Sequence, residues 1–167
     1  MPERAELLPV LSSRAAELVR ALGLAPHPEG GFYREVFRST ATVQTGDGRG
    51  ERSALTTIDF LLGRGQCSAW HRVRSDEAWH LLEGGPLRLW LLGPERDRIE
   101  AVDLADDTRR HVVPADAWQA AEPLADFAYV GATVGPGFDF ADFSFGRDDA
   151  LLCNVIERLA PDLKRLL

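Results

Sequence analysis

The chain has 167 residues, with 19 basic and 26 acidic residues that give a formal net charge of −7. Hydrophobic residues make up 45% and charged residues 27% of the sequence, which is typical of a globular domain and excludes a disordered or fibrous chain. The acidic balance and the absence of a basic run argue against nucleic acid or an anionic membrane as a partner. We therefore expect one domain over 1–167.

Cysteine content and the opening sequence predict the cellular location. Cys67 and Cys153 are too few for a disulfide framework and do not form a Cys-x-x-Cys pair. The opening sequence MPERAELLPVLSSR lacks the basic start and apolar run of a signal peptide. No stretch reaches the roughly 18 apolar residues of a membrane-spanning helix. These features predict a cytoplasmic protein.

Hydrophobic periodicity changes along the chain from helical to strand-like and back. Apolar residues at helical spacing predict a helix over about 12–22, with Gly23 as its stop. Short apolar runs between Gly- and Pro-rich turns then predict strands. These runs cover 32–38, 54–62, 66–73, 77–82, 87–91, 100–104, 108–113, 127–131 and 138–145. A second helical pattern covers about 149–165, interrupted near Pro161. Strands without intervening helices predict an all-β sandwich or barrel over about 30–146.

His71 and Glu77 are the strongest candidates for chemistry. His71 lies on a predicted strand and Glu77 follows after a short turn, so that in a hairpin both side chains converge on one interior. An imidazole and a carboxylate are suitable ligands for zinc, manganese or iron. They are equally suitable as a proton-transfer pair. A buried histidine satisfied by a neighbouring carboxylate is the structural alternative.

The segment from Gly65 to Gly84 resembles the first motif of the cupin superfamily. That motif reads Gly, five residues, His-x-His, three residues, Glu, six residues, Gly, and the spacing here matches throughout. Val73, however, stands where the second histidine belongs. The second cupin motif is faint, because Asp116 replaces its glycine and Gln119 replaces its histidine.

The wider pattern, over about 18–145, resembles one cupin subfamily long filed as a domain of unknown function. The resemblance is carried by HPEGGFYRE (27–35), SAWHRVRSDEAWHLLEG (68–84), VPADAWQA (113–120) and VGATVGPGFDFADF (130–143). It implies an all-β cupin fold, a double-stranded β-helix or jelly-roll barrel, with an N-terminal and a short C-terminal helix. It also implies a pocket inside the barrel for a small-molecule ligand, and commonly a homodimer.

A metal-free enzyme is the first functional hypothesis. Cupin-fold sugar epimerases look similar in outline, with a histidine base, a tyrosine acid and an open barrel mouth. By this resemblance His71 is the base, Glu77 orients it, and Tyr129 or Tyr33 is the acid. The expected reaction is isomerase- or epimerase-like, on a sugar-like or carbonyl-bearing substrate.

Further residues are candidates for contact with the ligand. Gln119 replaces a motif histidine, and Glu29 follows His27 in a glycine-rich turn that can point it into the pocket. Trp79 falls on the inner face by alternation from Glu77, whereas His80 reaches the ligand only if a bulge reverses that alternation. Arg72 and Arg74 flank His71 and are candidates to recognise an anionic group at the mouth.

Three rival functions remain open at this point. Typical metal cupins are similar in offering three histidines and one glutamate, whereas this chain keeps only His71 and Glu77. A divalent metal would then be held by His71, Glu77 and Gln119, with water. A second rival is a binding module that carries or senses a small molecule without turnover. A third is a structural role in which a Trp-rich surface forms a dimer interface and the pocket is vestigial.

Overall fold

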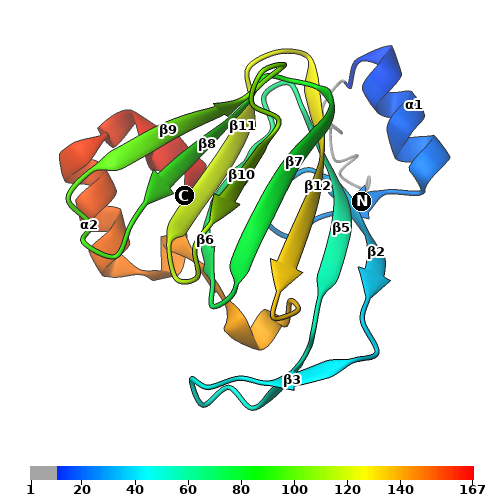
Figure 1. Ribbon diagram of the computed structural model, residues 1–167. Coiled ribbons are helices and arrows are strands. Elements are labelled where there is room, and N and C mark those ends of the chain that lie inside the picture. The colour runs from blue at the N-terminus through cyan, green and yellow to red at the C-terminus, as the bar shows by residue number, and fades with distance from the viewer. Residues whose placement is uncertain (1–10) are drawn as a thin grey trace, which may run out of the picture.

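Two antiparallel sheets face each other in the computed structural model, which describes residues 11–167 (Figure 1). The larger sheet contains, in spatial order, β1 (Ala25–Pro26), β2 (Phe32–Arg38), β5 (Thr56–Gly63), β12 (Phe127–Gly135), β7 (Asp76–Gly84) and β10 (Arg110–Val113). The smaller sheet contains β13 (Phe143–Phe145), β6 (Ser68–Val73), β11 (Trp118–Pro123), β8 (Leu87–Leu92) and β9 (Ile99–Leu104). From β5 to β13 the chain changes sheet at every connection except that between β8 and β9. This connectivity is a double-stranded β-helix, and it confirms the predicted all-β jelly roll.

Helices flank the two sheets on opposite sides (Figure 1). The helix α1 (Ser13–Leu22) begins after Ser12, whose hydroxyl accepts a hydrogen bond from the Ala15 amide, and ends at Gly23 with a φ of 64°. The C-terminal helix α2 (Ala150–Leu159) is capped by the Asp149 carboxylate. Pro161 has no N–H to continue it, so the 3-10 segment η3 (Pro161–Leu166) follows.

The structure adds the short strands 25–26, 42–44 and 51–53 to those expected from the sequence, and it differs from expectation over 118–123 and 138–145. Periodicity predicts no strand over 118–123, yet β11 lies there. The pattern missed this strand because its inward residues include the polar Gln119. A strand predicted over 138–145 is instead a 3-10 turn, η1 (Phe140–Asp142), followed by the short β13. The Asp139 carboxylate accepts a hydrogen bond from the Ala141 amide at 2.8 Å, which favours this tight turn over an extended strand.

One end of the barrel interior is filled by apolar side chains from both sheets. Phe60, Trp79 and Leu81 of the larger sheet pack with Leu89 and Ala121 of the smaller sheet, and all are at most 4% exposed. Aliphatic and aromatic packing of this kind excludes water and supplies most of the stability of a small domain. The opposite end of the barrel is where the interior remains open.

The outer faces of the sheets are covered unequally by the helices. Trp70 and Trp118 of the smaller sheet pack under Leu152 and Ile156 of α2. The helix α1 covers only one end of the larger sheet, where Leu18 packs near Phe32 and Leu61. Most of the remaining outer face of the larger sheet is therefore not covered by a helix within residues 11–167.

The strands β3 (Thr42–Gln44) and β4 (Glu51–Ser53) form a hairpin arm that extends beyond the barrel (Figure 1). Its anchor is Asp142, which is 3% exposed and accepts hydrogen bonds from Arg49 at 3.0 Å and from Arg52 at 2.8 Å. These charge-assisted bonds join the arm to the turn η1 at the open end of the barrel.

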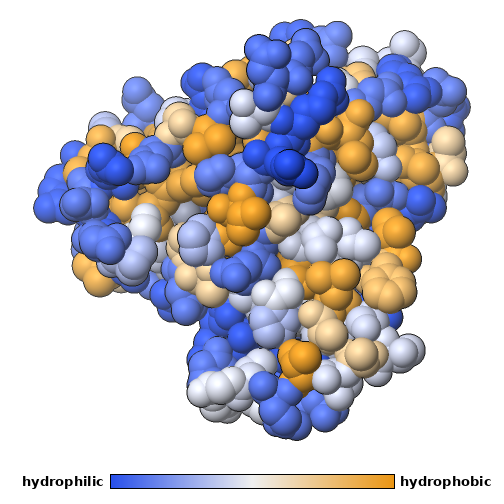
Figure 2. Space-filling model, in the orientation of Figure 1, coloured by the Kyte–Doolittle hydropathy of each residue, from blue (hydrophilic) through white to orange (hydrophobic). Residues whose placement is uncertain are grey.

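Hydrophilic side chains are spread over the face shown in Figure 2, with hydrophobic side chains in separate groups between them. Exposed hydrophobic residues of the larger sheet include Phe37, Leu82 and Val112, each about half exposed or more. Across residues 11–167, no helix has the length and apolar character needed to span a membrane.

Candidate functional site

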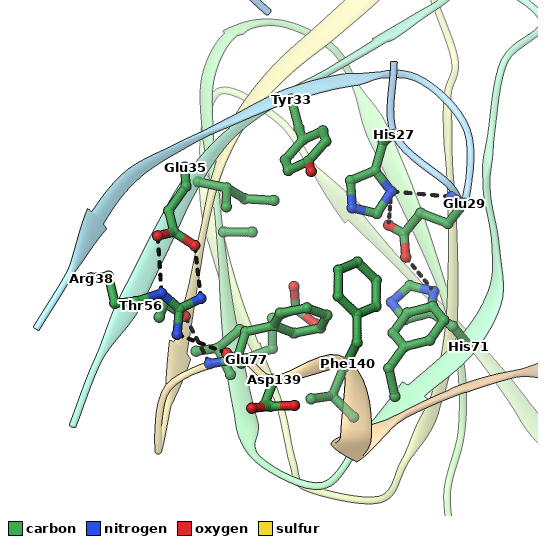
Figure 3. A pocket seen from close by; sticks show the side chains of 16 residues that line it. His27, Glu29, Tyr33, Glu35, Arg38, Thr56, His71, Glu77, Asp139 and Phe140 are labelled. Atoms are coloured by element: carbon green, nitrogen blue, oxygen red, sulfur yellow. Dashed lines mark hydrogen bonds and ion pairs between the residues drawn. The ribbon is translucent and has the colours of Figure 1, made fainter. Parts of the chain in front are cut away.

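The open end of the barrel holds a pocket with a volume of about 340 Å³ (Figure 3). Its walls come from β2, β5, β6, β7 and β12, together with the loop before β2 and the segment around η1. His71 and Glu77, which the sequence singled out, both line this pocket. The pocket therefore joins the two strongest sequence candidates in one place.

Two β-bulges determine which side chains reach the pocket. In β6, His71 pairs with Gln119, whereas Ser68 pairs with Ala121. The segment between Ser68 and His71 therefore holds one extra residue, and this bulge lets both Ser68 and His71 face the interior. In β2, Glu35 pairs with Ile58 and Phe37 with Thr57, which places a bulge at Val36. This bulge turns Arg38 to the same side as Glu35.

His71 is 2% exposed, and its tautomer is fixed by the backbone. Its Nδ1 lies 2.7 Å from the Ala69 carbonyl oxygen, so Nδ1 carries the hydrogen and Nε2 keeps a lone pair. The imidazole stacks on Phe143, with ring centroids 5.4 Å apart and an interplanar angle of 15°. Burial lowers the pKa of His71, so the ring is neutral at neutral pH. His71 thus offers Nε2 as an acceptor for a proton.

His27 has the opposite tautomer. Its Nδ1 accepts a hydrogen bond from the Glu29 backbone amide at 3.1 Å, so the ring hydrogen lies on Nε2. The ring contacts Tyr33 edge to face, with centroids 4.5 Å apart, and both line the pocket. Burial lowers the pKa of His27 to about 4. His27 is therefore a neutral hydrogen-bond donor where His71 is a neutral acceptor.

Glu77 is held from behind by a chain of two hydrogen bonds. The Trp79 indole donates to Gln119 Oε1 at 2.8 Å, and Gln119 Nε2 donates to Glu77 Oε2 at 2.6 Å. Because an indole N–H can only donate, the Gln119 oxygen must face Trp79 and its amide nitrogen must face Glu77. Burial is the main reason that the pKa of Glu77 rises to about 7. Its other oxygen, Oε1, has no hydrogen-bond partner in the described part of the chain.

Glu29 supports His71 from the loop before β2. One of its oxygens accepts a hydrogen bond from the Ser68 hydroxyl at 2.6 Å, and the other lies 3.3 Å from His71 Nδ1. Burial raises the pKa of Glu29 to about 8. The loop is pressed against β6: the Ala69 amide donates to the Glu29 carbonyl, and a Cβ on Gly30 would collide with the Cys67 carbonyl. Only glycine fits here, since φ at Gly30 is also 112°.

The rim of the pocket carries an ion pair and aromatic rings. Arg38 donates to the Glu35 carboxylate at 2.8 and 3.0 Å and to the Phe138 carbonyl at 3.0 Å. Phe140 and Phe143 complete this edge with Phe138, and their ring centroids are 5.0 to 6.1 Å apart.

Two predicted site residues do not reach the pocket, which corrects the expectation for each. Tyr129 lies on the outer face of β12, packed near α1, and its hydroxyl donates to Asp59 at 2.9 Å. His80 also faces away, because β7 alternates regularly from Glu77 through Trp79 and its bulge comes later, at Leu82. Tyr33 is the tyrosine that lines the pocket.

Two other predicted contacts lie one layer deeper than expected. Trp79 and Gln119 are each 1% exposed and do not line the cavity. They support Glu77 instead of touching a ligand. The expected orienting role of Glu77 toward His71 is also corrected, because Ala69 and Glu29 are the groups that contact His71 Nδ1.

The proposed metal ligands His71, Glu77 and Gln119 do not fit a divalent ion. Gln119 presents its amide N–H₂ to Glu77 and has its oxygen bonded to Trp79, so it offers no oxygen ligand. Val73 faces the pocket where the second motif histidine would stand. Within residues 11–167, no group of three or more His, Cys, Asp or Glu side chains is arranged to hold a metal. The mechanism below therefore uses no metal.

Sequence reasoning missed His27 and Arg38 as pocket residues. His27 precedes the glycine pair of the HPEGG segment, and that pair was the available signal for a loop folded against the barrel. Arg38 gave no such signal, because plain alternation along β2 from Tyr33 places it on the outer face.

A jelly roll whose polar pocket opens between the two sheets, built on the Gly65–Gly84 segment, defines the class: this is a cupin. The family is the cupin superfamily group described as DUF985, which matches residues 16–146, and the chain belongs to it. This confirms the resemblance found in the sequence. No curated protein matches the chain in sequence.

Solved structures show the same fold at different distances. A hypothetical protein from Leishmania major has a TM-score of 0.80 and 30% identity, over 91% of this chain and 97% of that chain. A Shewanella oneidensis protein has a TM-score of 0.74 and 28% identity, over 91% and 93%. Oxalate decarboxylase from Bacillus subtilis has a TM-score of 0.55 and 14% identity, over 85% and 36%, and shares only the fold.

Proposed function

We propose that this protein binds a small polar, carbonyl-bearing ligand in the open end of the barrel and moves a proton on it, as an isomerase or epimerase does. One observation carries the proposal. His71 and Glu77 both line one pocket, and neither His71 Nε2 nor Glu77 Oε1 has a hydrogen-bond partner in residues 11–167. Ala69 and Glu29 hold His71, and Gln119 holds Glu77, so His71 Nε2 and Glu77 Oε1 are available to a ligand.

The two groups suit opposite halves of a proton transfer. Neutral His71 removes the proton on the carbon next to the carbonyl, and the electron pair of the C–H bond moves to the carbonyl oxygen. The Nε2–H of His27 can stabilise the resulting enolate by a hydrogen bond. Glu77, whose pKa is about 7, returns a proton to the carbon and becomes a carboxylate. Proton exchange with water then restores both groups.

Glu29 assists in this scheme without touching the ligand. When His71 takes the proton it becomes an imidazolium, and the carboxyl oxygen of Glu29 at 3.3 Å from Nδ1 supports that charge. We therefore assign Glu29 as a positioning residue for His71.

Exchange of carbon-bound hydrogen in heavy water tests the proposal. A panel of small hydroxyketones, aminoketones and reducing sugars is incubated with the protein in D₂O, and loss of the proton next to the carbonyl is followed by NMR. For a panel member that exchanges, His71→Gln should slow exchange by about 100-fold or more, the usual contribution of one acid–base group. His80→Gln, on the outer face of the neighbouring strand, should exchange normally.

Circular dichroism and thermal unfolding show whether His71→Gln keeps the fold. Unchanged exchange in a folded His71→Gln protein would remove His71 as the base. Ligand binding without any exchange across the panel would instead favour a binding module.

A further inference from the structure

Acidic side chains outnumber basic ones in the lining of the pocket. Four carboxyl groups belong to the lining, on Glu29, Glu35, Glu77 and Asp139, against one guanidinium, on Arg38. The two histidines add no positive charge at neutral pH, because burial lowers the pKa of each. Burial likewise raises the pKa of Glu29 to about 8, so that Glu77 and Asp139 are the carboxyl groups that can supply negative charge outside the Glu35–Arg38 pair. An anionic ligand would therefore enter an environment with little positive charge to receive it.

The guanidinium of Arg38 is already engaged by the protein. Its Nε and Nη2 donate to the two oxygens of Glu35, and its Nη1 donates to the Phe138 carbonyl. This bidentate pair neutralises the only permanently charged cation that the described residues contribute to the lining.

Neighbouring arginines do not supply a replacement. Arg72, expected at the mouth, lies over the Trp118 ring on the outer face, with 4.8 Å between its guanidinium carbon and the ring centroid. Arg74 pairs with Asp47, and Arg49 and Arg52 are bonded to Asp142. The predicted recognition of an anionic group by Arg72 and Arg74 is thus corrected.

Aromatic and carboxyl groups together form the remaining wall. Phe138, Phe140 and Phe143 line the same pocket as Glu77. Glu77 is 7% exposed, and its Oε1 has no hydrogen-bond partner within the described residues. An aromatic ring attracts a cation through its negatively charged face, and a carboxyl oxygen accepts an ammonium N–H.

We infer that the pocket selects a small polar ligand that carries a protonated amine and rejects the anionic counterpart of the same size. The inference rests on the proposed function only in placing the ligand in this pocket. Glu77 Oε1, in the carboxylate form, is the group that receives the ammonium, with the rim phenylalanines beside it; for such a ligand the His71 imidazolium, and not Glu77, returns the proton to carbon. An aminated carbonyl compound or polyol is the corresponding ligand class, in contrast to sugar phosphates and carboxylic acids.

Size-matched probes that differ in charge test this selectivity. Glucamine, sorbitol and gluconate share a six-carbon chain and end in an ammonium, a hydroxyl and a carboxylate. Aminoacetone, hydroxyacetone and pyruvate form the matching three-carbon ketone series. Binding is measured at millimolar concentration by saturation-transfer NMR and by thermal shift, at about pH 7. The ammonium member of each series should bind, and the carboxylate member should bind at least about tenfold more weakly, the energy of one charge-assisted hydrogen bond.

Two variants separate the contributions of individual charges. Glu77→Gln keeps the shape of the side chain and should weaken the ammonium probe by about tenfold, with little effect on the hydroxyl probe. Glu35→Gln, at the exposed rim, should release Arg38 and strengthen binding of gluconate and pyruvate. The second variant is at the surface, so it tests the inference even if Glu77→Gln fails to fold.

Charge selectivity that follows this order, and shifts in Glu35→Gln, supports the inference whether or not any probe is turned over. Equal binding of the hydroxyl and ammonium probes, tighter binding of the carboxylates, or no binding by either series would overturn it. Selective binding without hydrogen exchange would leave the inference intact while contradicting the proposed proton transfer.

Discussion

At the residue scale, the main feature of the pocket is that its four buried ionisable groups are all shifted toward their neutral forms. Burial raises the pKa of Glu29 to about 8 and that of Glu77 to about 7, and lowers the pKa of His27 to about 4 and of His71 in the same direction. Desolvation penalises the charged form of each group. With these four groups near their neutral forms, Glu77 is available as an acid and His71 as a base near neutral pH.

These shifts predict how stability depends on pH. The two carboxyl groups bind more protons in the folded state than in the unfolded state between about pH 4.5 and their raised pKa values, so their contribution to stability falls as pH rises. The two histidines bind fewer protons when folded below about pH 6.5, so their contribution rises with pH and offsets that fall. Above about pH 6.5 only the two carboxyl groups still change their proton binding on unfolding, so the free energy of unfolding should decrease up to about pH 8.

Urea denaturation at several pH values checks this expectation. Glu29→Gln should flatten the decrease between about pH 7 and 8, where Glu29 titrates and the slope reaches about 1.4 kcal/mol per pH unit per proton. Glu83→Gln is the control, because Glu83 lies near the surface and the Arg14 guanidinium lowers its pKa, out of this range. A decrease that persists unchanged in Glu29→Gln would mean that Glu29 is ionised in the folded protein.

At the element scale, the bulges of β2 and β6 explain where prediction from sequence succeeds and where it stops. Turn residues and alternation placed most strands, and alternation from Glu77 correctly put Trp79 inward and His80 outward. The same rule fails across a bulge, so it cannot bring Ser68 and His71, or Glu35 and Arg38, to one side. A bulge depends on pairing with a distant strand, which local sequence does not encode.

The layer under α2 gives a stability prediction at the same scale. Ile156 is fully buried against the tryptophans of the smaller sheet, whereas Leu151 on the same helix is 59% exposed. Ile156→Ala should lower the free energy of unfolding by about 3 kcal/mol, through lost burial and the cavity that remains. Leu151→Ala should change it by less than about 0.5 kcal/mol. Equal effects in chemical denaturation would mean that α2 is not packed on the sheet as described.

At the scale of the whole molecule, the net charge of −7 has the same sign as the carboxylate form of Glu77. Long-range attraction of a cation therefore adds to local recognition, and it is screened over about 10 Å at 0.1 M salt. Predictions from the sequence reached this scale well, since the strand pattern indicates an all-β domain and the resemblance of the Gly65–Gly84 segment to a cupin motif indicates the family that matches residues 16–146.

The salt dependence of ligand binding should measure this long-range electrostatic attraction. Raising sodium chloride from about 20 mM to about 500 mM should weaken glucamine binding by about two- to fivefold, because the surface charges are screened. Sorbitol, which is uncharged, should bind equally at both concentrations. A salt effect of equal size on both probes would indicate general destabilisation of the protein and not screening.

The one-way chain from Trp79 through Gln119 to Glu77 has a stereochemical consequence. Because the indole cannot accept a hydrogen bond, the chain cannot reverse, and Glu77 Oε2 remains occupied by the Gln119 amide. A proton on Glu77 therefore sits on Oε1 and leaves from a single direction. A planar enolate held in this pocket would be protonated by Glu77 on one face only, so each turnover through Glu77 would set one configuration at the new stereocentre.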